Sequence, residues 1–244
     1  GGHRVGLAGK VNTWGGRVKA VQHITFFNIR IAKQSIGVAQ PIMPYVYQGD
    51  YLNTLIIGPP QSGKTTLIRD MTRLISSGWQ NIFPKKVAVI DERSEIAASI
   101  KGTPQHDVGK RTDVLDACPK AEGMMMMIRS MSPEIIVVDE IGHEEDVRAL
   151  LEAIHAGVII FCTMHGRSLA ELKRRPSLIP LFDAHVFKRM IILDHHGKGP
   201  GYIKAIYNEQ EKNLYQNTRC LDREVDWRTA FHQHHHVDRY RMES

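Results

Sequence analysis

A glycine-rich run, GPPQSGKTT at residues 58–66, constrains the fold of this chain more than any other feature. It directly follows an apolar run, residues 54–58, and opens a segment, residues 64–77, in which apolar residues recur at helical spacing. Between a strand and a helix, such glycines let backbone N–H groups point into the loop, and the helix N-terminus favours an anion there. The pattern therefore predicts a phosphate-binding P-loop.

The chemistry of phosphate binding predicts specific roles for two residues of this loop. Lys64 is expected to reach the β- and γ-phosphates, and the Thr65 hydroxyl to bind Mg²⁺. The expected ligand is ATP, although a loop that contacts phosphates does not distinguish adenine from guanine. The residues expected around the phosphates are Gly58, Pro59, Pro60, Gln61, Ser62, Gly63, Lys64, Thr65 and Thr66.

A second apolar run, IIVV at residues 135–138, ends in two acidic residues, Asp139 and Glu140. In open α/β sheets ligands bind at the carboxyl ends of the strands, where these side chains would lie. We expect Asp139 to hold Mg²⁺, directly or through water, and Glu140 to polarise the attacking water. Acidic residues at a strand end are common, so the prediction depends on the P-loop upstream.

Two other apolar runs end in candidate site residues. After residues 87–90 comes the acidic cluster that contains Asp91, Glu92 and Glu95. Glu92 is expected to be catalytic or to organise the metal, whereas surface ion pairs explain Asp91 and Glu95 equally well. The run at residues 158–163 is followed by His165, which could sense the γ-phosphate or relay to a neighbouring subunit.

Arg129 lies just before the strand that leads to Asp139. A guanidinium there could neutralise developing phosphate charge or brace the acidic pair. Arg129 is interpreted equally well as a surface arginine at the end of a helix, without a role in the site.

These continuously apolar runs are typical of parallel strands that are buried on both faces. Helical patterns at residues 64–77 and 144–156 alternate with them, each followed by a glycine. Segments 185–194 and 201–207 are expected to form a terminal hairpin. The sequence thus predicts an α/β fold: a RecA-like P-loop NTPase core with a mostly parallel sheet, at residues 51–207.

The rest of the chain divides into three parts. Residues 1–36 contain two strand patterns around a turn at Trp14, and we interpret them as the remnant of a β-rich N-terminal domain, because two strands alone are marginally stable. The chain begins at Gly1 without Met, which suggests a fragment lacking its natural start. Residues 37–50 are expected to be a linker, and residues 208–244 a polar, flexible, His-rich tail of undetermined role.

Composition narrows the class of protein only moderately. The net charge of +6 suits anionic ligands, nucleic acid or an anionic membrane face without choosing among them. The cysteines, Cys118, Cys162 and Cys220, are far apart, which argues against a disulfide scaffold or a zinc site and fits a reducing compartment. No apolar stretch is long enough to span a bilayer.

The order of the motifs (P-loop, acidic box, DE-ended strand, histidine) resembles the ATPases of type II and type IV secretion systems and pilus motors. The segments at residues 66–78, 89–142 and 163–166 resemble more closely the stage III sporulation protein AA family of endospore-forming bacteria, with chloroplast and cyanobacterial relatives sharing much of this core. The resemblance spans residues 4–194, and DERSEIA and DEIG are its most specific parts. Here Asp139-Glu140 stands where many secretion ATPases have Gly-Glu.

This resemblance implies a cytoplasmic ATPase, a hexameric ring docked at the mother-cell side of a membrane-embedded channel to the forespore. It also implies that an N-terminal domain supplies arginines to a neighbouring subunit's nucleotide, and Arg30, then Arg17, best match such positions. Two alternatives are kept: a nucleic-acid-coupled RecA-like ATPase, and a nucleotide-gated scaffold with little turnover. The absence of interleaved aromatic and basic residues argues against nucleic acid as a partner.

Overall fold

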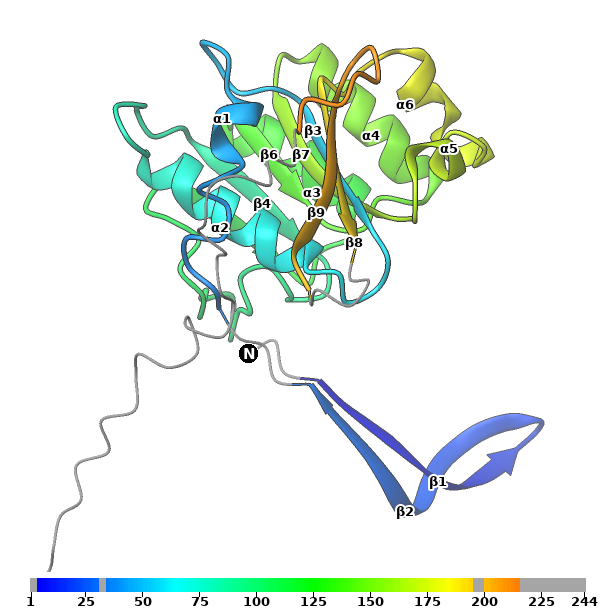
Figure 1. The fold of residues 1–244 in the computed structure, drawn as a ribbon. Helices are drawn as coiled ribbons and strands as arrows, with labels where there is room; N and C mark the ends of the chain where they lie inside the picture. Colours follow the sequence, from blue (N-terminus) through cyan, green and yellow to red (C-terminus); the bar gives the residue numbers. More distant parts are fainter. Residues whose placement is uncertain (1–3, 31–33, 195–199, 216–244) are drawn as a thin grey trace, which may run out of the picture.

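The computed structural model of the chain describes residues 4–30, 34–194 and 200–215. Its main part is a sheet of seven strands with helices on both faces (Figure 1). The strands lie in the order β5-β4-β6-β7-β3-β8-β9, and all neighbours are parallel except β8 and β9. They are β3 (Thr54–Gly58), β4 (Val87–Asp91), β5 (Thr112–Asp116), β6 (Ile135–Val138), β7 (Ile159–His165), β8 (Arg189–Asp194) and β9 (Tyr202–Asn208).

The helices cover the sheet in two layers. The face that carries Ile56 packs on α1 and α2, and the face that carries Leu55 and Ile57 packs on the other helices. They are α1 (Met43–Val46), α2 (Lys64–Ser77), α3 (Lys120–Met131), α4 (Glu144–His155), α5 (Leu169–Leu172) and α6 (Ile179–Asp183), with a short 3₁₀ helix, η1 (Pro176–Leu178). Burying each large apolar side chain of the central strands stabilises the fold by roughly 1.5–3 kcal/mol.

The predicted α/β architecture is confirmed. The apolar runs are strands β3, β4, β6 and β7, the helical patterns are α2 and α4, and the terminal hairpin is β8–β9. The edge strand β5 escaped prediction because TDVLD is short and only half-buried, so it lacks an apolar run. No helix within the described residues is long and apolar enough to cross a membrane.

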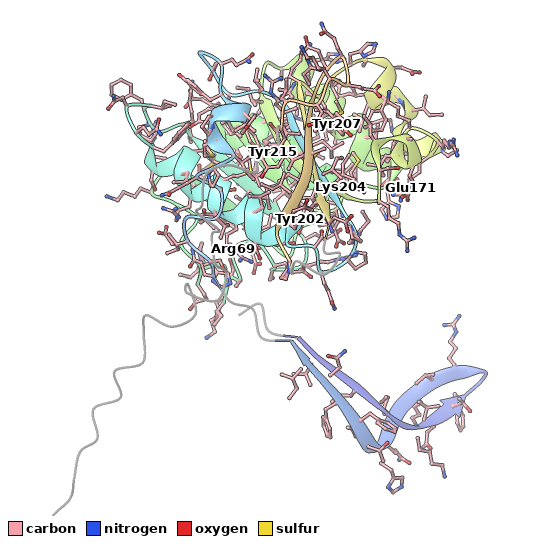
Figure 2. All side chains as sticks on the ribbon, viewed as in Figure 1. Arg69, Glu171, Tyr202, Lys204, Tyr207 and Tyr215 are labelled. Atoms are coloured by element: carbon pink, nitrogen blue, oxygen red, sulfur yellow. The ribbon has the colours of Figure 1, made fainter. Side chains whose placement is uncertain are left out.

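The N-terminal region forms the expected hairpin, β1 (Arg4–Trp14) with β2 (Arg17–Arg30). Gly15 and Gly16 make the turn, and both have positive φ, as a tight right-twisted hairpin requires. Large apolar side chains are exposed on this ribbon, including Trp14 at 78% and Phe26 at 71%, and side chains project from both of its faces (Figure 2). This distribution is that of a strand pair without a core of its own.

Two segments expected to be loose are packed on the core. In the predicted linker, Ala39, Ile42, Met43 and Val46 are buried against α2 and β3. Beyond the predicted domain end, Tyr215 packs edge-on against Tyr45, with ring centroids 6.2 Å apart. The apolar residues of the first segment pack on the sheet face despite Pro41 and Pro44, and Tyr215 packs against the same layer. Most of the predicted tail, residues 216–244 with its histidines and Cys220, lies outside the described residues.

Candidate functional site

The P-loop joins β3 to α2 in a tight conformation. Gln61 and Gly63 have φ of 64° and 94°, the left-handed region that glycine adopts at least cost. A Cβ at Gly58 would collide with the Ser62 hydroxyl, and one at Gly63 would lie 3.0 Å from the Gly201 backbone nitrogen. The Ser62 hydroxyl is buried and has no hydrogen-bond partner among the described residues. A close-wound loop with an unsatisfied buried polar atom fits a phosphate cradle.

Lys64, the first residue of α2, is buried at the mouth of this loop. Its Nζ donates to the carbonyl oxygens of Gly58 and Pro59, at 3.1 and 3.0 Å, and lies 3.1 Å from Nδ1 of His165. Burial lowers the pKa of the ammonium from its usual value, while the nearby carboxylates of Asp139, Glu140 and Glu95 oppose that shift. The amine therefore lies where phosphate charge would replace carbonyl contacts.

Asp139 follows β6 and faces the P-loop. Its Oδ2 accepts a hydrogen bond of 2.8 Å from the Thr65 hydroxyl, and its Oδ1 accepts one from the Thr163 hydroxyl. A hydroxyl and a carboxylate side by side are the hard oxygen donors that Mg²⁺ prefers. Thr65 and Asp139 thus fit a magnesium site in their chemistry and are brought together as the sequence predicted.

Glu140 is held at both oxygens of its carboxylate. Oε1 lies 2.7 Å from Nε2 of His165, and Oε2 forms an ion pair with Nη1 of Arg93. Its backbone N–H donates to the Thr163 hydroxyl at 2.9 Å, and its φ of 55° is unusual for a residue other than glycine. Such a backbone costs on the order of 1 kcal/mol, which the surrounding hydrogen bonds offset.

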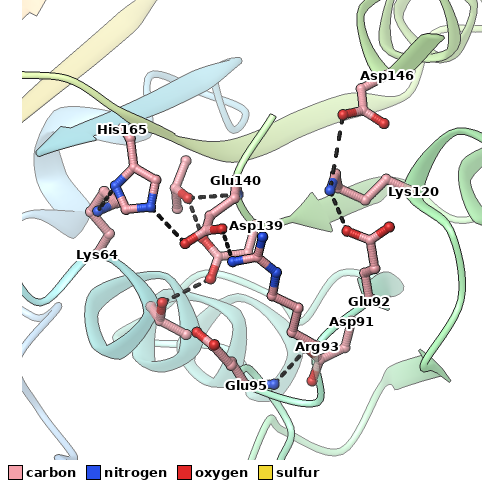
Figure 3. Close-up of polar contacts among 12 residues, drawn as sticks. Lys64, Asp91, Glu92, Arg93, Glu95, Lys120, Asp139, Glu140, Asp146 and His165 are labelled. Atoms are coloured by element: carbon pink, nitrogen blue, oxygen red, sulfur yellow. Dashed lines mark hydrogen bonds and ion pairs between the residues drawn. The ribbon is translucent and has the colours of Figure 1, made fainter. Parts of the chain in front are cut away.

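His165 connects Lys64 to Glu140, as Figure 3 shows. Its strand, β7, pairs with β3 so that His165 stands opposite Gly58. Because the Lys64 ammonium can only donate, Nδ1 of His165 accepts its hydrogen bond. The N–H at Nε2 then donates a hydrogen bond to Oε1 of Glu140. Lys64, His165, Glu140 and Arg93 form one continuous chain of contacts, which we call the P-loop chain.

The structure does not bring Glu92 into this chain. Its Oε2 accepts a 2.5 Å hydrogen bond from Nζ of Lys120, which also lies 4.0 Å from Oδ2 of Asp146 (Figure 3). Among the described residues, no hydrogen bond or ion pair joins Glu92 to Lys64 or Glu140. We call Glu92, Lys120 and Asp146 the α3–α4 cluster, after the helices whose first turns carry the last two.

Arg129 also lies elsewhere. It is in the last turn of α3, which starts near the carboxyl end of β5 and leads to the amino end of β6. A helix of 12 residues is about 18 Å long, so Arg129 is near the sheet edge opposite Lys64. Its position just before β6 in sequence places it at the far end of that strand from Asp139. It therefore does not brace Asp139 and Glu140 within this chain.

The remaining acidic candidates stabilise a loop. The carboxylate of Asp91 is buried, and its two oxygens accept the backbone N–H groups of Glu95 and Ala97, each at 2.8 Å. Burial raises its pKa above the usual value, while those hydrogen bonds act in the opposite direction. Asp91 is thus a loop anchor, and Glu95 lies beside the site, close enough for its charge to affect Lys64.

Arg17 is exposed at the turn end of β2, and the side chain of Arg30 lies outside the described part of the chain. Thr163, Arg93 and Lys120 also take part in these contacts, although the sequence patterns did not predict a role for them. Only Thr163 had a usable signal: it precedes His165 by two residues on one strand, so both side chains lie on the same face.

Known proteins match this chain over most of its length. The family model described as sporulation stage III, protein AA matches residues 1–214. Over 218 residues the chain is 56% identical to stage III sporulation protein AA of Bacillus subtilis, which covers 89% of this chain and 71% of that protein.

Two solved structures have a similar fold. The Legionella pneumophila ATPase DotB is 18% identical, with a TM-score of 0.54, and the match covers 78% of this chain and 53% of that one. The pilus retraction motor PilT with bound ADP is 17% identical, with a TM-score of 0.54, and the match covers 89% of this chain and 65% of that one. This chain thus spans less than two thirds of either protein, and the likeness shows the fold. On the sequence match, the chain belongs to the stage III sporulation protein AA family.

Proposed function

We propose that this chain is a magnesium-dependent ATPase that works as a ring of six copies on the mother-cell side of a membrane complex. There it drives assembly of, or transport through, the channel between mother cell and forespore. The observation that carries the ATPase proposal is the meeting of Lys64, Thr65, Asp139, Glu140 and His165 at one sheet edge. The sporulation role is carried over from the name of the B. subtilis relative, and the ring from the resemblance to secretion ATPases.

The chemistry proposed for the site is the in-line attack of water on the γ-phosphate. Mg²⁺, held by Thr65 and Asp139, would neutralise phosphate charge when bound. Lys64 binds the terminal phosphates, and Glu140 orients the water. His165 carries a proton on Nε2 toward Glu140 and accepts from Lys64 at Nδ1, so it can report on whether Lys64 has turned to a phosphate.

The test is ATP turnover by the purified protein beside Lys64→Ala. We expect turnover to require Mg²⁺ and to fall on the order of 10³-fold or more in the variant, because the lysine contacts the charge that develops during transfer. Lys101→Ala, at an exposed turn away from the site, is the matched control and should keep the wild-type rate. Equal turnover in wild type and Lys64→Ala would overturn the proposal.

The ring is tested separately by measuring particle size with and without a non-hydrolysable ATP analogue. A six-copy particle supports the secretion-type motor, and a monomer under both conditions contradicts the ring for this chain. Turnover that rises on addition of DNA or RNA, with steep salt dependence, would instead favour a nucleic-acid motor.

A further inference from the structure

Arg93 occupies a position that the proposed chemistry does not yet use. It projects from the loop after β4, the strand beside β6, and its guanidinium reaches across to Oε2 of Glu140 (Figure 3). The Arg93 side chain is 53% exposed, whereas that of Glu140 is 20% exposed. An arginine that is half in solvent thus holds a carboxylate that is mostly enclosed.

The loop that presents Arg93 is anchored from several sides. Asp91 accepts two of its backbone N–H groups, and the hydroxyl of Ser94, which has a φ of 52°, donates to Oδ1 of Asp116 at 2.6 Å. Arg69 of α2, buried below the loop, donates to the carbonyl oxygens of Glu95 and Ile96, each at 2.5 Å. These contacts fix where the base of the Arg93 side chain stands relative to the P-loop helix.

The carboxylate of Glu140 depends on two partners for its orientation. The last torsion of a glutamate is broad, so a single hydrogen bond leaves the plane of the carboxylate free to rotate. With His165 on Oε1 and Arg93 on Oε2, that plane is fixed. We propose that Arg93 is the positioning residue of Glu140, setting the direction in which it meets the attacking water. This inference rests on the proposed ATPase function.

A positioning role has a specific kinetic signature. Removing Arg93 leaves the P-loop intact, so nucleotide affinity is unaffected, whereas a displacement of about 1 Å at the base costs on the order of 10²-fold in rate. Because Arg93 acts through Glu140, its removal has no further effect once Glu140 has lost its function. A merely structural role would lower stability and would be independent of Glu140.

The experiment compares wild type, Arg93→Ala, Arg93→Lys, Glu140→Gln and the double variant Arg93→Ala/Glu140→Gln in one turnover assay. We expect Arg93→Ala to lower kcat by about 10- to 100-fold with KM changed by less than about twofold. Arg93→Lys should recover part of that loss, since lysine supplies the charge without the fork of the guanidinium. The double variant should turn over within about twofold of Glu140→Gln.

The controls separate this inference from the proposed function. Arg148→Ala, an exposed arginine on α4, should match wild type, and the melting temperature of Arg93→Ala should be close to that of wild type. If Lys64→Ala abolishes turnover but Arg93→Ala keeps the wild-type kcat, the role of Arg93 is overturned and the proposed function stands. An equal loss from Arg93→Ala in the Glu140→Gln background does the same. If Lys64→Ala turns over ATP at the wild-type rate, both proposals are overturned.

Discussion

Two clusters of charged residues, the P-loop chain and the α3–α4 cluster, lie at the carboxyl edge of the same sheet. The difference between them shows which residues are available to bind a ligand. In the P-loop chain the hydrogen bonds of the Lys64 ammonium within the described residues go to neutral partners, two carbonyl oxygens and an imidazole nitrogen, and the nearby carboxylates act on it without a direct contact. In the α3–α4 cluster the ammonium of Lys120 is already neutralised by the carboxylates of Glu92 and Asp146. The first cation can still exchange its partners for a phosphate, whereas the second has its counter-charge within the protein.

Of the variants that test this comparison, Glu140→Gln is expected to have the largest effect on turnover. The amide keeps the shape of the side chain but loses the charge that Arg93 and an attacking water require. We expect kcat for ATP to fall on the order of 10²- to 10³-fold, while binding of a non-hydrolysable ATP analogue is retained. Steady-state turnover and titration with the labelled analogue measure the two quantities. A variant that turned over at the wild-type rate would remove Glu140 from the reaction.

Lys120→Met tests the other side of the comparison, because this cluster should support the fold rather than the reaction. Removing the cation leaves Asp146 buried with its charge unpaired beside Glu92. For fully buried pairs such a loss costs about 3–5 kcal/mol, and we expect about 2–3 kcal/mol here because Glu92 is 39% exposed. Urea unfolding measures the loss, and kcat below the melting temperature should stay near wild type. A large fall in kcat without a loss of stability would place Lys120 in the site.

The reach of sequence reasoning differs between the same two groups. The sequence was enough to predict which side chains meet at the P-loop, because each of them follows or opens an element whose direction the apolar runs define. These residues are Lys64, Thr65, Asp139, Glu140 and His165. Parallel strands then bring their carboxyl ends to one edge.

Glu92 and Arg129 could not be placed in the same way. Glu92 and Arg93 are neighbours, and which of them turns to Glu140 depends on the positive φ of Ser94 and on Arg69, a residue of α2. Such long-range anchoring leaves no local pattern. Arg129 shows a different limit, because closeness in sequence to a strand does not tell which end of the strand a side chain joins.

Thr163→Val asks how far the P-loop chain extends along β7. The hydroxyl of Thr163 donates to Asp139 and accepts the backbone N–H of Glu140, so it holds both acidic residues in place. Valine keeps the branched shape and removes these bonds, at a cost of about 1–2 kcal/mol for the groups left unpaired. We expect kcat to fall about 10-fold and the dependence on Mg²⁺ to weaken, as measured by titrating the metal at saturating ATP. Thr163→Ser, which keeps the hydroxyl, is the control and should stay close to wild type.

The smallest expected effect comes from Glu92→Gln. This variant tests most directly whether Glu92 belongs to the α3–α4 cluster or to the nucleotide site. The sequence predicts a catalytic or metal-organising glutamate at this position, whereas the structure pairs it with Lys120 away from Lys64. Because Asp146 remains to balance Lys120, and Glu92 is partly exposed, we expect a stability loss of less than about 1 kcal/mol. The same variant should keep its kcat and Mg²⁺ dependence within about twofold of wild type. A fall in kcat comparable to that of Glu140→Gln would show that the loop after β4 turns Glu92 toward the nucleotide during turnover, and the separation of the two groups would then hold only for the arrangement described.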